Sequence, residues 1–288
     1  MLLDSYGKYI FYDGAMGTML YKYGLKSGDK PDLMNLTAPD VVENIHKMYI
    51  AAGSDIICTN TFGSNSLYLD GTGHSPTEII TAAVTIARRA CQTTSSSKNA
   101  KTLVALDIGS TGRLIEPYGD LEPERAYELF TEMAVAGERA GADVAAIETM
   151  SDIAELKASM LAVRENTKLP ILATMTFEKS GSTFMGTSPE EFVKTAEDLG
   201  ALAVGLNCSL EPREMIDIAR RIANATTLPL IVKPNAGLPD SDSGKYHTGA
   251  KEFAVQMKEF TKIKARIIGG CCGTTPEYIE EMKRIYTA

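Results

Sequence analysis

The sequence predicts a single-domain α/β protein with the closed (β/α)₈ architecture of a TIM barrel. Eight short runs of apolar and β-branched residues alternate with eight longer amphipathic segments. Several of the short runs, such as LVAL, VAAI and ALAVGL, are apolar throughout, which is typical of parallel strands covered on both faces. The chain has 288 residues, and eight β/α units usually take about 250 residues.

Each predicted strand is an apolar run that ends in polar residues or glycine. In chain order the strands are expected at Tyr9–Asp13, Asp55–Thr61, Thr102–Ile108, Asp143–Thr149, Ile171–Phe177, Ala201–Cys208, Leu230–Asn235 and Arg266–Cys271. A helical segment separates each strand from the next, as a parallel arrangement requires.

The helical segments carry start and stop signals. They are expected to begin near Pro39, Pro76, Pro123, Asp152, Pro189, Pro212, Ala250 and Pro276. Six of these eight starts are prolines, whose ring fits the first helical turn because the N–H group there has no partner. Ser75 and Ser188 each precede a glutamate by three residues, which matches a capping box. Gly53, Gly141 and Gly200 stand where a left-handed residue would end a helix.

An open, doubly wound sheet is the alternative α/β architecture. The sequence has no Gly-x-Gly-x-x-Gly after the first predicted strand and no GxxxxGK[ST] anywhere, so the usual phosphate-binding loops of open sheets are missing. One barrel spanning residues 1–288 is therefore the expected domain organisation.

Composition narrows the partners and the compartment. The chain carries 29 basic and 37 acidic residues, a formal net charge of −8, which disfavours nucleic acid and anionic membranes as partners. No apolar run reaches the roughly 18 residues of a membrane-spanning helix, and the first residues include Asp4 where a signal peptide would be basic. Five cysteines do not form the dense, even-numbered framework of a small secreted domain. We expect a cytoplasmic protein.

Three of the five cysteines fall at predicted strand ends. Cys208 ends the sixth strand, and Cys271 and Cys272 end the eighth. In a parallel barrel these ends form the rim that carries the active site. Zinc accepts three protein ligands while keeping a fourth position open for catalysis. Neighbouring strand side chains point in opposite directions, but Gly273 allows the backbone to turn and bring both sulfurs to one side.

Two other interpretations of these cysteines remain open at this point. The three thiols could pack as small hydrophobic groups, or Cys271 and Cys272 could form a redox-active vicinal pair. An isolated Cys-Cys pair is a weaker metal signal than paired CxxC motifs.

Two carboxylates end apolar strands on the same rim. Asp13 and Glu148 would be costly there without a partner, so each is expected to face a cation or a hydrogen-bond donor, such as the ammonium group of an amino-acid substrate. The alternative is that they cap helices or form rim salt bridges. Ser110 and Thr111, in the loop after the third strand, offer N–H groups and hydroxyls to a substrate carboxylate.

Other residues carry weaker signals. Lys233 ends the seventh strand and could form a Schiff base, although a lysine on a barrel rim is more often solvated or ion-paired. Glycines around the eighth strand end could bind phosphate, but the two cysteines in the same turn favour a metal. His46, His74 and His247 have no metal-ligand spacing and are expected to be structural.

Four motifs together resemble the homocysteine S-methyltransferase family. They are the segments DGAMGT at residues 13–18, GLNC at 205–208, PNAG at 234–237 and GGCCGT at 269–274. The sequence is most similar to the homocysteine-binding barrel of cobalamin-dependent methionine synthases, and the likeness extends from about Ile10 to Arg284.

The resemblance implies a role for each matching residue. Cys208, Cys271 and Cys272 would bind Zn²⁺ and serve the catalytic chemistry, with the sulfur of homocysteine in the fourth position. The carboxylates of Asp13 and Glu148 would hold the substrate ammonium group. Gly14, Ser110 and Thr111 would lie near the substrate backbone, and Asn235 would be an extra zinc ligand without substrate. A metal-bound thiol is deprotonated at neutral pH and could accept a methyl group, yielding methionine.

The sequence is compatible with more than one methyl donor. Folate and corrinoid domains do not fit in 288 residues beside a barrel, so a methylcobalamin or other methyl-corrinoid donor would arrive on a separate protein. Relatives in the family use betaine or S-methylmethionine, and aromatic cages suit such cationic donors. The chain has no tryptophan, which favours the corrinoid donor. A Lys233 Schiff-base lyase and a non-catalytic subunit that presents homocysteine remain the alternatives.

Overall fold

The computed structural model describes residues 2–94, 101–240 and 246–287 and has eight parallel strands in a ring. The strands are β1 (Ile10–Phe11), β2 (Ile56–Cys58), β3 (Leu103–Ile108), β4 (Val144–Met150), β5 (Ile171–Met175), β6 (Ala203–Asn207), β7 (Leu230–Lys233) and β8 (Ala265–Ile268). The hydrogen-bonded order runs from β1 through β8 and back down to β2. A parallel bridge between Tyr12 and Ile56 joins β1 to β2, so the single-domain (β/α)₈ barrel is confirmed.

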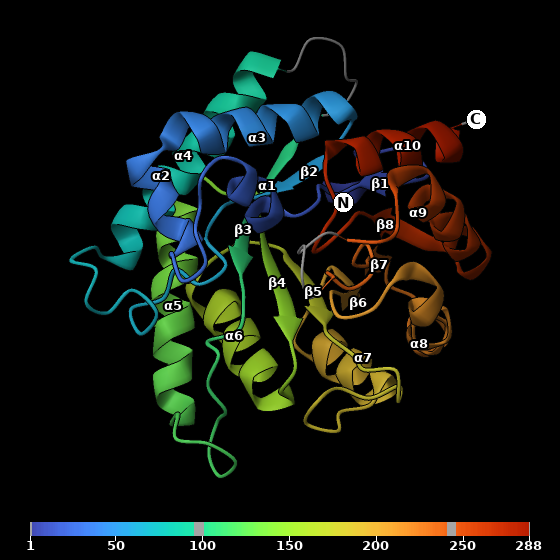
Figure 1. Ribbon diagram of the computed structural model, residues 1–288. Helices are drawn as coiled ribbons and strands as arrows, with labels where there is room; N and C mark the ends of the chain where they lie inside the picture. Colours follow the sequence, from blue (N-terminus) through green and yellow to red (C-terminus); the bar gives the residue numbers. More distant parts are fainter. Residues whose placement is uncertain (1, 95–100, 241–245, 288) are drawn as a thin grey trace.

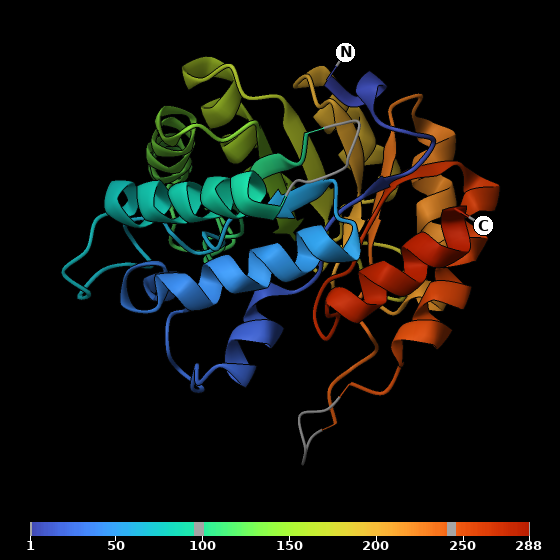
Figure 2. The same ribbon diagram turned by 90° about the horizontal axis from the view of Figure 1, so that it is seen from above.

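Helices surround this ring on its outside (Figure 1). They are α3 (Pro39–Ala52), α4 (Pro76–Thr94), α5 (Pro123–Ala140), α6 (Ile153–Asn166), α7 (Pro189–Asp198), α8 (Pro212–Ala225), α9 (Ala250–Met257) and α10 (Pro276–Thr287). The first connection adds α1 (Met16–Lys22), α2 (Met34–Thr37) and the 3-10 helix η2 (Pro31–Leu33), while the 3-10 helices η1 (Leu2–Ser5) and η3 (Lys258–Ile263) precede β1 and follow α9. Figure 2 shows α10 beside α3, so the last β/α unit closes the molecule against the first. None of the helices in the described residues is long and apolar enough to cross a membrane.

The predicted start and stop signals act largely as expected. All six prolines are the first residue of a helix, and Gly53 and Gly141 adopt left-handed backbone directly after α3 and α5. Ser75 and Ser188 each accept the expected first-turn N–H, but the complete reciprocal capping box lies at Glu211 and Glu214 of α8.

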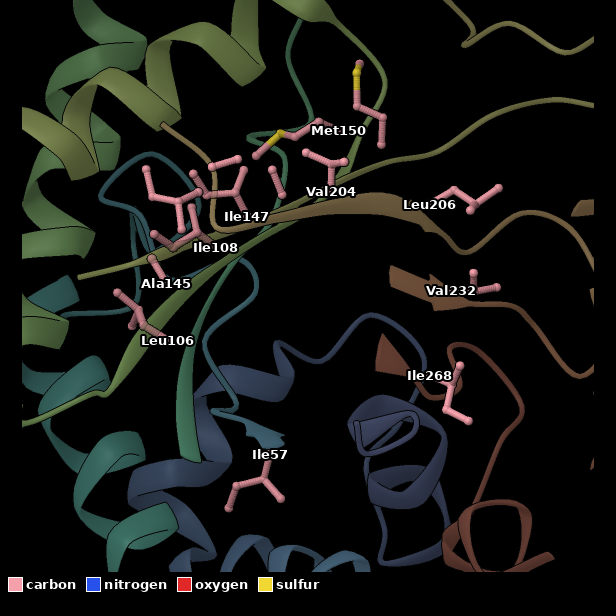
Figure 3. Packing of buried hydrophobic residues seen from close by; sticks show 14 of the residues in the cluster. Ile57, Leu106, Ile108, Ala145, Ile147, Met150, Val204, Leu206, Val232 and Ile268 are labelled. Carbon is pink, nitrogen blue, oxygen red and sulfur yellow. The ribbon is translucent and has the colours of Figure 1, made fainter. Parts of the chain in front are cut away.

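Buried side chains form two clusters on the two faces of the barrel wall. The outer cluster lies between strands and helices and includes Ile57, Leu106 and Ile268 (Figure 3). The inner cluster fills the barrel and includes Leu103 and Ala105. Successive strand residues point to opposite faces, so β3 sends Leu103 and Ala105 inward and Leu106 outward.

The same alternation continues to the carboxyl ends of the strands, where the inward positions become polar. These inward positions hold Asp107 in β3, Glu148 in β4 and Lys233 in β7, one layer above the apolar filling. At the opposite end, Leu3 of η1 joins the inner cluster and closes the barrel floor. The polar layer therefore lies at the end of the barrel where a TIM barrel carries its active site.

Candidate active site

A cavity of about 500 Å³ opens at the carboxyl ends of the strands. Its walls include most of the residues that the sequence singled out, namely Cys208, Cys271, Cys272, Asp13, Gly14, Ser110, Thr111, Glu148 and Lys233. Asn235 does not line this cavity. Residues 14–18 and Pro31 of the first connection also contribute to the wall, so this segment covers one side of the site.

The structure brings the three rim cysteines together. Their sulfur atoms all lie within 4.8 Å of one another, and the Sγ atoms of Cys208 and Cys272 are 3.9 Å apart. Two ligands of a tetrahedral zinc ion with Zn–S bonds of about 2.3 Å lie about 3.8 Å apart. All five cysteines are free of disulfides, and these three form a group that could hold a metal ion.

The local backbone explains how residues from two strands reach this spacing. Cys208 and Ser209 adopt left-handed backbone with φ near 63° and 62°, which turns the chain sharply at the end of β6. Gly273, with φ of 83°, does the same after Cys272, and a side chain there would meet the ring of Tyr246. Left-handed backbone is costly for residues other than glycine, so the turn at Cys208 is a specific feature of the site.

The sulfur atoms share hydrogen bonds. Interactions with Cys271 and Cys272 lower the pKa of Cys208 to about 3. The same interactions with Cys208 raise the pKa of Cys272 to about 12 and that of Cys271 well above its usual value. The protein thus stabilises negative charge within this group, which suits a cation ligand.

Two asparagines flank the cysteines. Asn207 is fully buried, and its Nδ2 donates to Thr149 Oγ1 at 2.7 Å and to Cys271 Sγ at 3.9 Å. Its Oδ1 accepts from the N–H of Thr149, a residue with positive φ. Asn235 is buried, and its Oδ1 has no partner in the described part of the chain, so it stays a predicted extra ligand. Sequence reasoning missed Asn207, although its position before Cys208 was a signal.

A buried ion pair lies beneath the cysteines. The Nζ atom of Lys233 is 2.5 Å from Glu148 Oε2 and lies 4.2 Å from the centre of the Tyr12 ring. Burial alone would lower the pKa of Lys233, but the acidic groups around it, including Cys58 and Glu148, raise that pKa well above 10.5. A protonated lysine cannot attack a carbonyl, so this contact disfavours the Schiff-base alternative. The same contact agrees with the alternative expectation for Glu148, namely that its carboxylate forms a salt bridge.

Asp13 lies in the same layer. Its Oδ2 accepts the N–H of Cys58 at 2.8 Å, and its Oδ1 is buried with no partner among the described residues. Burial raises the pKa of Asp13 to about 7. At Gly14, a Cβ atom would lie 2.6 Å from Thr274 Oγ1, so only glycine fits between Asp13 and that side chain.

The loop that carries Ser110 and Thr111 is held from α6. Glu155 accepts from Ser110 Oγ at 2.9 Å and from both the N–H and the hydroxyl of Thr111, at 2.7 and 2.6 Å. Both hydroxyls therefore donate to Glu155, whereas the sequence led us to expect them to bind a substrate carboxylate. Within the described residues, the N–H of Ser110 makes no hydrogen bond.

A second group of side chains that could bind a metal ion lies deeper in the cavity. Cys58, Asp107 and Glu148 offer atoms within 4.8 Å of one another, and all three are buried. Lys233 already contacts Glu148 there, so this group holds a cation of its own. Sequence reasoning did not single out Asp107, although its place at the end of β3 matches that of Glu148 on β4.

The three histidines, which the sequence predicts to be structural, are not among the described residues that line the cavity. His46 is fully buried in α3, and burial lowers its pKa to about 4. His74 bonds Glu78 at the surface, and His247 is exposed.

A family model and two named relatives match this chain in sequence. The model of the homocysteine S-methyltransferase family matches residues 10–286. Two proteins named methionine synthase, from Mycobacterium leprae (strain TN) and Mycobacterium tuberculosis (strain ATCC 25618 / H37Rv), are each 32% identical over 286 residues. These alignments cover 94% of the chain but 24% of each relative, so the chain spans about a quarter of their length.

Solved structures give the same fold. The oxidized form of the homocysteine methyltransferase MmuM from Escherichia coli superposes with a TM-score of 0.86 at 22% identity, covering 99% of this chain and 98% of that one. Its metallated form has a TM-score of 0.85 at 22% identity, with coverages of 99% and 100%. Because the family model spans nearly the whole chain, the protein belongs to the homocysteine S-methyltransferase family.

Proposed function

We propose that this barrel activates homocysteine as a thiolate and transfers a methyl group to it, forming methionine. The observation that carries the proposal is the cluster of three cysteine sulfurs within 4.8 Å at a cavity that two strand-end carboxylates also line. Family membership supports the same chemistry. The E. coli protein MmuM, which superposes on this chain, is a homocysteine methyltransferase and agrees with the proposal.

Cys208, Cys271 and Cys272 would hold the metal, which we propose is zinc. Their sulfur spacing and the lowered pKa of Cys208 fit a thiolate-rich zinc centre. When bound, zinc lowers the pKa of a fourth, substrate sulfur, so that a thiolate is available at neutral pH. Asn207 orients Cys271 through its amide, and Asn235 offers an oxygen near the cysteines when substrate is absent.

The remaining residues would orient the amino-acid part of homocysteine. Asp13 Oδ1 and the second carboxylate oxygen of Glu148 are the proposed acceptors for the ammonium group. Gly14 lets the backbone after Asp13 pack closely against Thr274, which fixes the position of Asp13 in the cavity wall. The loop of Ser110 and Thr111, fixed by Glu155, presents the N–H of Ser110 to the carboxylate. Held in this way, the sulfur attacks the methyl carbon, the S–C bond forms, and the donor keeps the electron pair of the broken bond.

We further propose that the donor is a methyl-corrinoid carried outside residues 1–288, in the cytoplasm. Phe62 and Tyr68 are the aromatic residues in the described cavity lining, fewer than a cage around a quaternary ammonium donor would use. Around the opening, loops after the strands expose Tyr118, Phe184 and Leu238, which suits contact with a second protein surface. The relatives named methionine synthase, of which the chain covers 24%, support methionine as the product.

A donor panel tests the proposal. Purified zinc-loaded protein is incubated with L-homocysteine and either methylcobalamin, betaine or S-methylmethionine, and methionine is measured by mass spectrometry. We expect methionine with methylcobalamin, and none from a Cys208→Ala variant.

Methionine from betaine or S-methylmethionine alone would contradict the corrinoid donor. Protein that binds homocysteine but forms no methionine with any donor would instead be a presenting subunit.

A further inference from the structure

Asp107 is a buried carboxylate that the proposed function leaves without a role. It occupies the inward position of β3 after Leu103 and Ala105, is 8% exposed, and lines the cavity. Its Oδ1 accepts no hydrogen bond from any residue in the described ranges. A buried oxygen of this kind is costly unless a donor reaches it, and the cavity is the side from which a ligand can approach.

The surroundings of Asp107 are rich in negative charge. Its carboxylate lies within 4.8 Å of that of Glu148, and Asp13 presents a second buried oxygen without a partner among the described residues. Lys233 forms an ion pair with Glu148. Three carboxylates therefore face one lysine, and Asp13 and Asp107 have no ion pair of their own within the described part of the chain.

We propose that Asp107 is a substrate-binding residue that receives the α-ammonium group of the thiol amino acid together with Asp13. Lys233 is the internal counter-ion of Glu148 through Oε2, the second Glu148 oxygen remains a proposed acceptor, and the substrate supplies the second cation. This inference rests on the proposed function, because homocysteine is the ligand that brings the ammonium group. It makes Asp107 a determinant of specificity for amino-acid thiols over thiols that lack the amine.

The energetics favour this assignment. Burial and the neighbouring Glu148 raise the pKa of Asp107 well above its usual value, so the site disfavours a further uncompensated negative charge. An ammonium in contact with both aspartates supplies the missing donor and the missing charge. A ligand without it leaves buried oxygens unpaired, which a site of this kind rejects strongly.

Calorimetric binding to the zinc-loaded protein tests the assignment without turnover. The two ligands are L-homocysteine and 4-sulfanylbutanoate, which has the same thiol and carboxylate but no amine. Asp107→Asn should weaken L-homocysteine binding by about tenfold or more and leave 4-sulfanylbutanoate unchanged. Asp217→Asn, an exposed residue of α8, should bind both ligands as the wild type does.

The outcomes separate this inference from the proposed function. Equal binding of L-homocysteine by wild type and Asp107→Asn, or an equal loss for both ligands, overturns the role of Asp107 alone. Wild-type protein that does not bind L-homocysteine overturns the proposed function as well. Zinc content and thermal unfolding report whether the variant is folded. If Asp107→Asn does not fold, Asp107→Ala is used to compare the binding of the two ligands.

Discussion

The ammonium of Lys233 lies 2.5 Å from the carboxylate of Glu148, and both side chains are buried beneath the cysteine cluster. The two residues come from β7 and β4 and are separated by 85 positions in the chain. Their contact gives the polar layer of the barrel a fixed internal charge pair. The stability of the barrel should therefore depend on keeping both partners.

Lys233→Met should destabilise the protein by about 3–5 kcal/mol, because it leaves Glu148 buried without its partner. Urea unfolding at neutral pH measures the change. The double variant Lys233→Met with Glu148→Gln should recover much of the loss, since neither charge then remains. A double variant as unstable as the sum of the two single variants would show that the residues do not act as a pair.

Removal of a single rim thiol should abolish metal binding. Cys208→Ala is expected to lose the zinc, about one ion per chain, that metal analysis of the purified wild type should find. Cys91→Ala is the control, because it removes a buried thiol on α4 outside the cavity. Full zinc occupancy in Cys208→Ala would rule out the proposed ligand set.

Much of the fold could be predicted because its signals are local. Proline at a helix start and glycine after its end act within a few residues, and the apolar runs mark the strands directly. Six of the eight predicted strands were too long at their carboxyl ends, whereas β3 ends where predicted and β4 runs one residue further, to Met150. For example, Asp55–Thr61 was expected where β2 is Ile56–Cys58, because the residues that follow turn into the loops of the site. The helices α1 and α2 within the first connection were not predicted.

Site residues that directly follow strands could be predicted from the sequence. Contacts between side chains from distant segments of the chain could not. Cys208 and Cys271 could be placed on one rim because all parallel strands end there. The pairing of Glu148 with Lys233, and of Thr111 with Glu155 from α6, depends on how distant segments pack. Asp107 was missed even though alternation along β3 pointed it inward.

Asp13 should make the stability of the protein fall as the pH rises. Its pKa is about 7 in the folded protein and about 3.8 in the unfolded chain, so the fold favours the protonated form. The free energy of unfolding contributed by Asp13 therefore decreases between pH 3.8 and 7 and stays low above pH 7. The free energy of unfolding of Asp13→Asn, measured in urea, should rise relative to that of the wild type by about 3 kcal/mol as the pH increases from 5 to 8. A constant difference between the two proteins would contradict the raised pKa.

His46 should make the stability of the protein fall as the pH decreases, the opposite of the effect of Asp13. Burial lowers its pKa to about 4, against 6.5 for an unperturbed histidine, so the folded protein keeps the ring neutral. The unfolded chain takes up a proton below pH 6.5, and stability is lost as the pH falls from 6.5 to 4. His46→Leu should remove about 2 kcal/mol of the loss that the wild type shows between pH 7.5 and 5, measured by urea unfolding. His74→Gln, which changes a half-buried histidine at the surface, should retain the wild-type loss. If His46→Leu lost as much stability in acid as His74→Gln, the loss would have to come from groups other than His46.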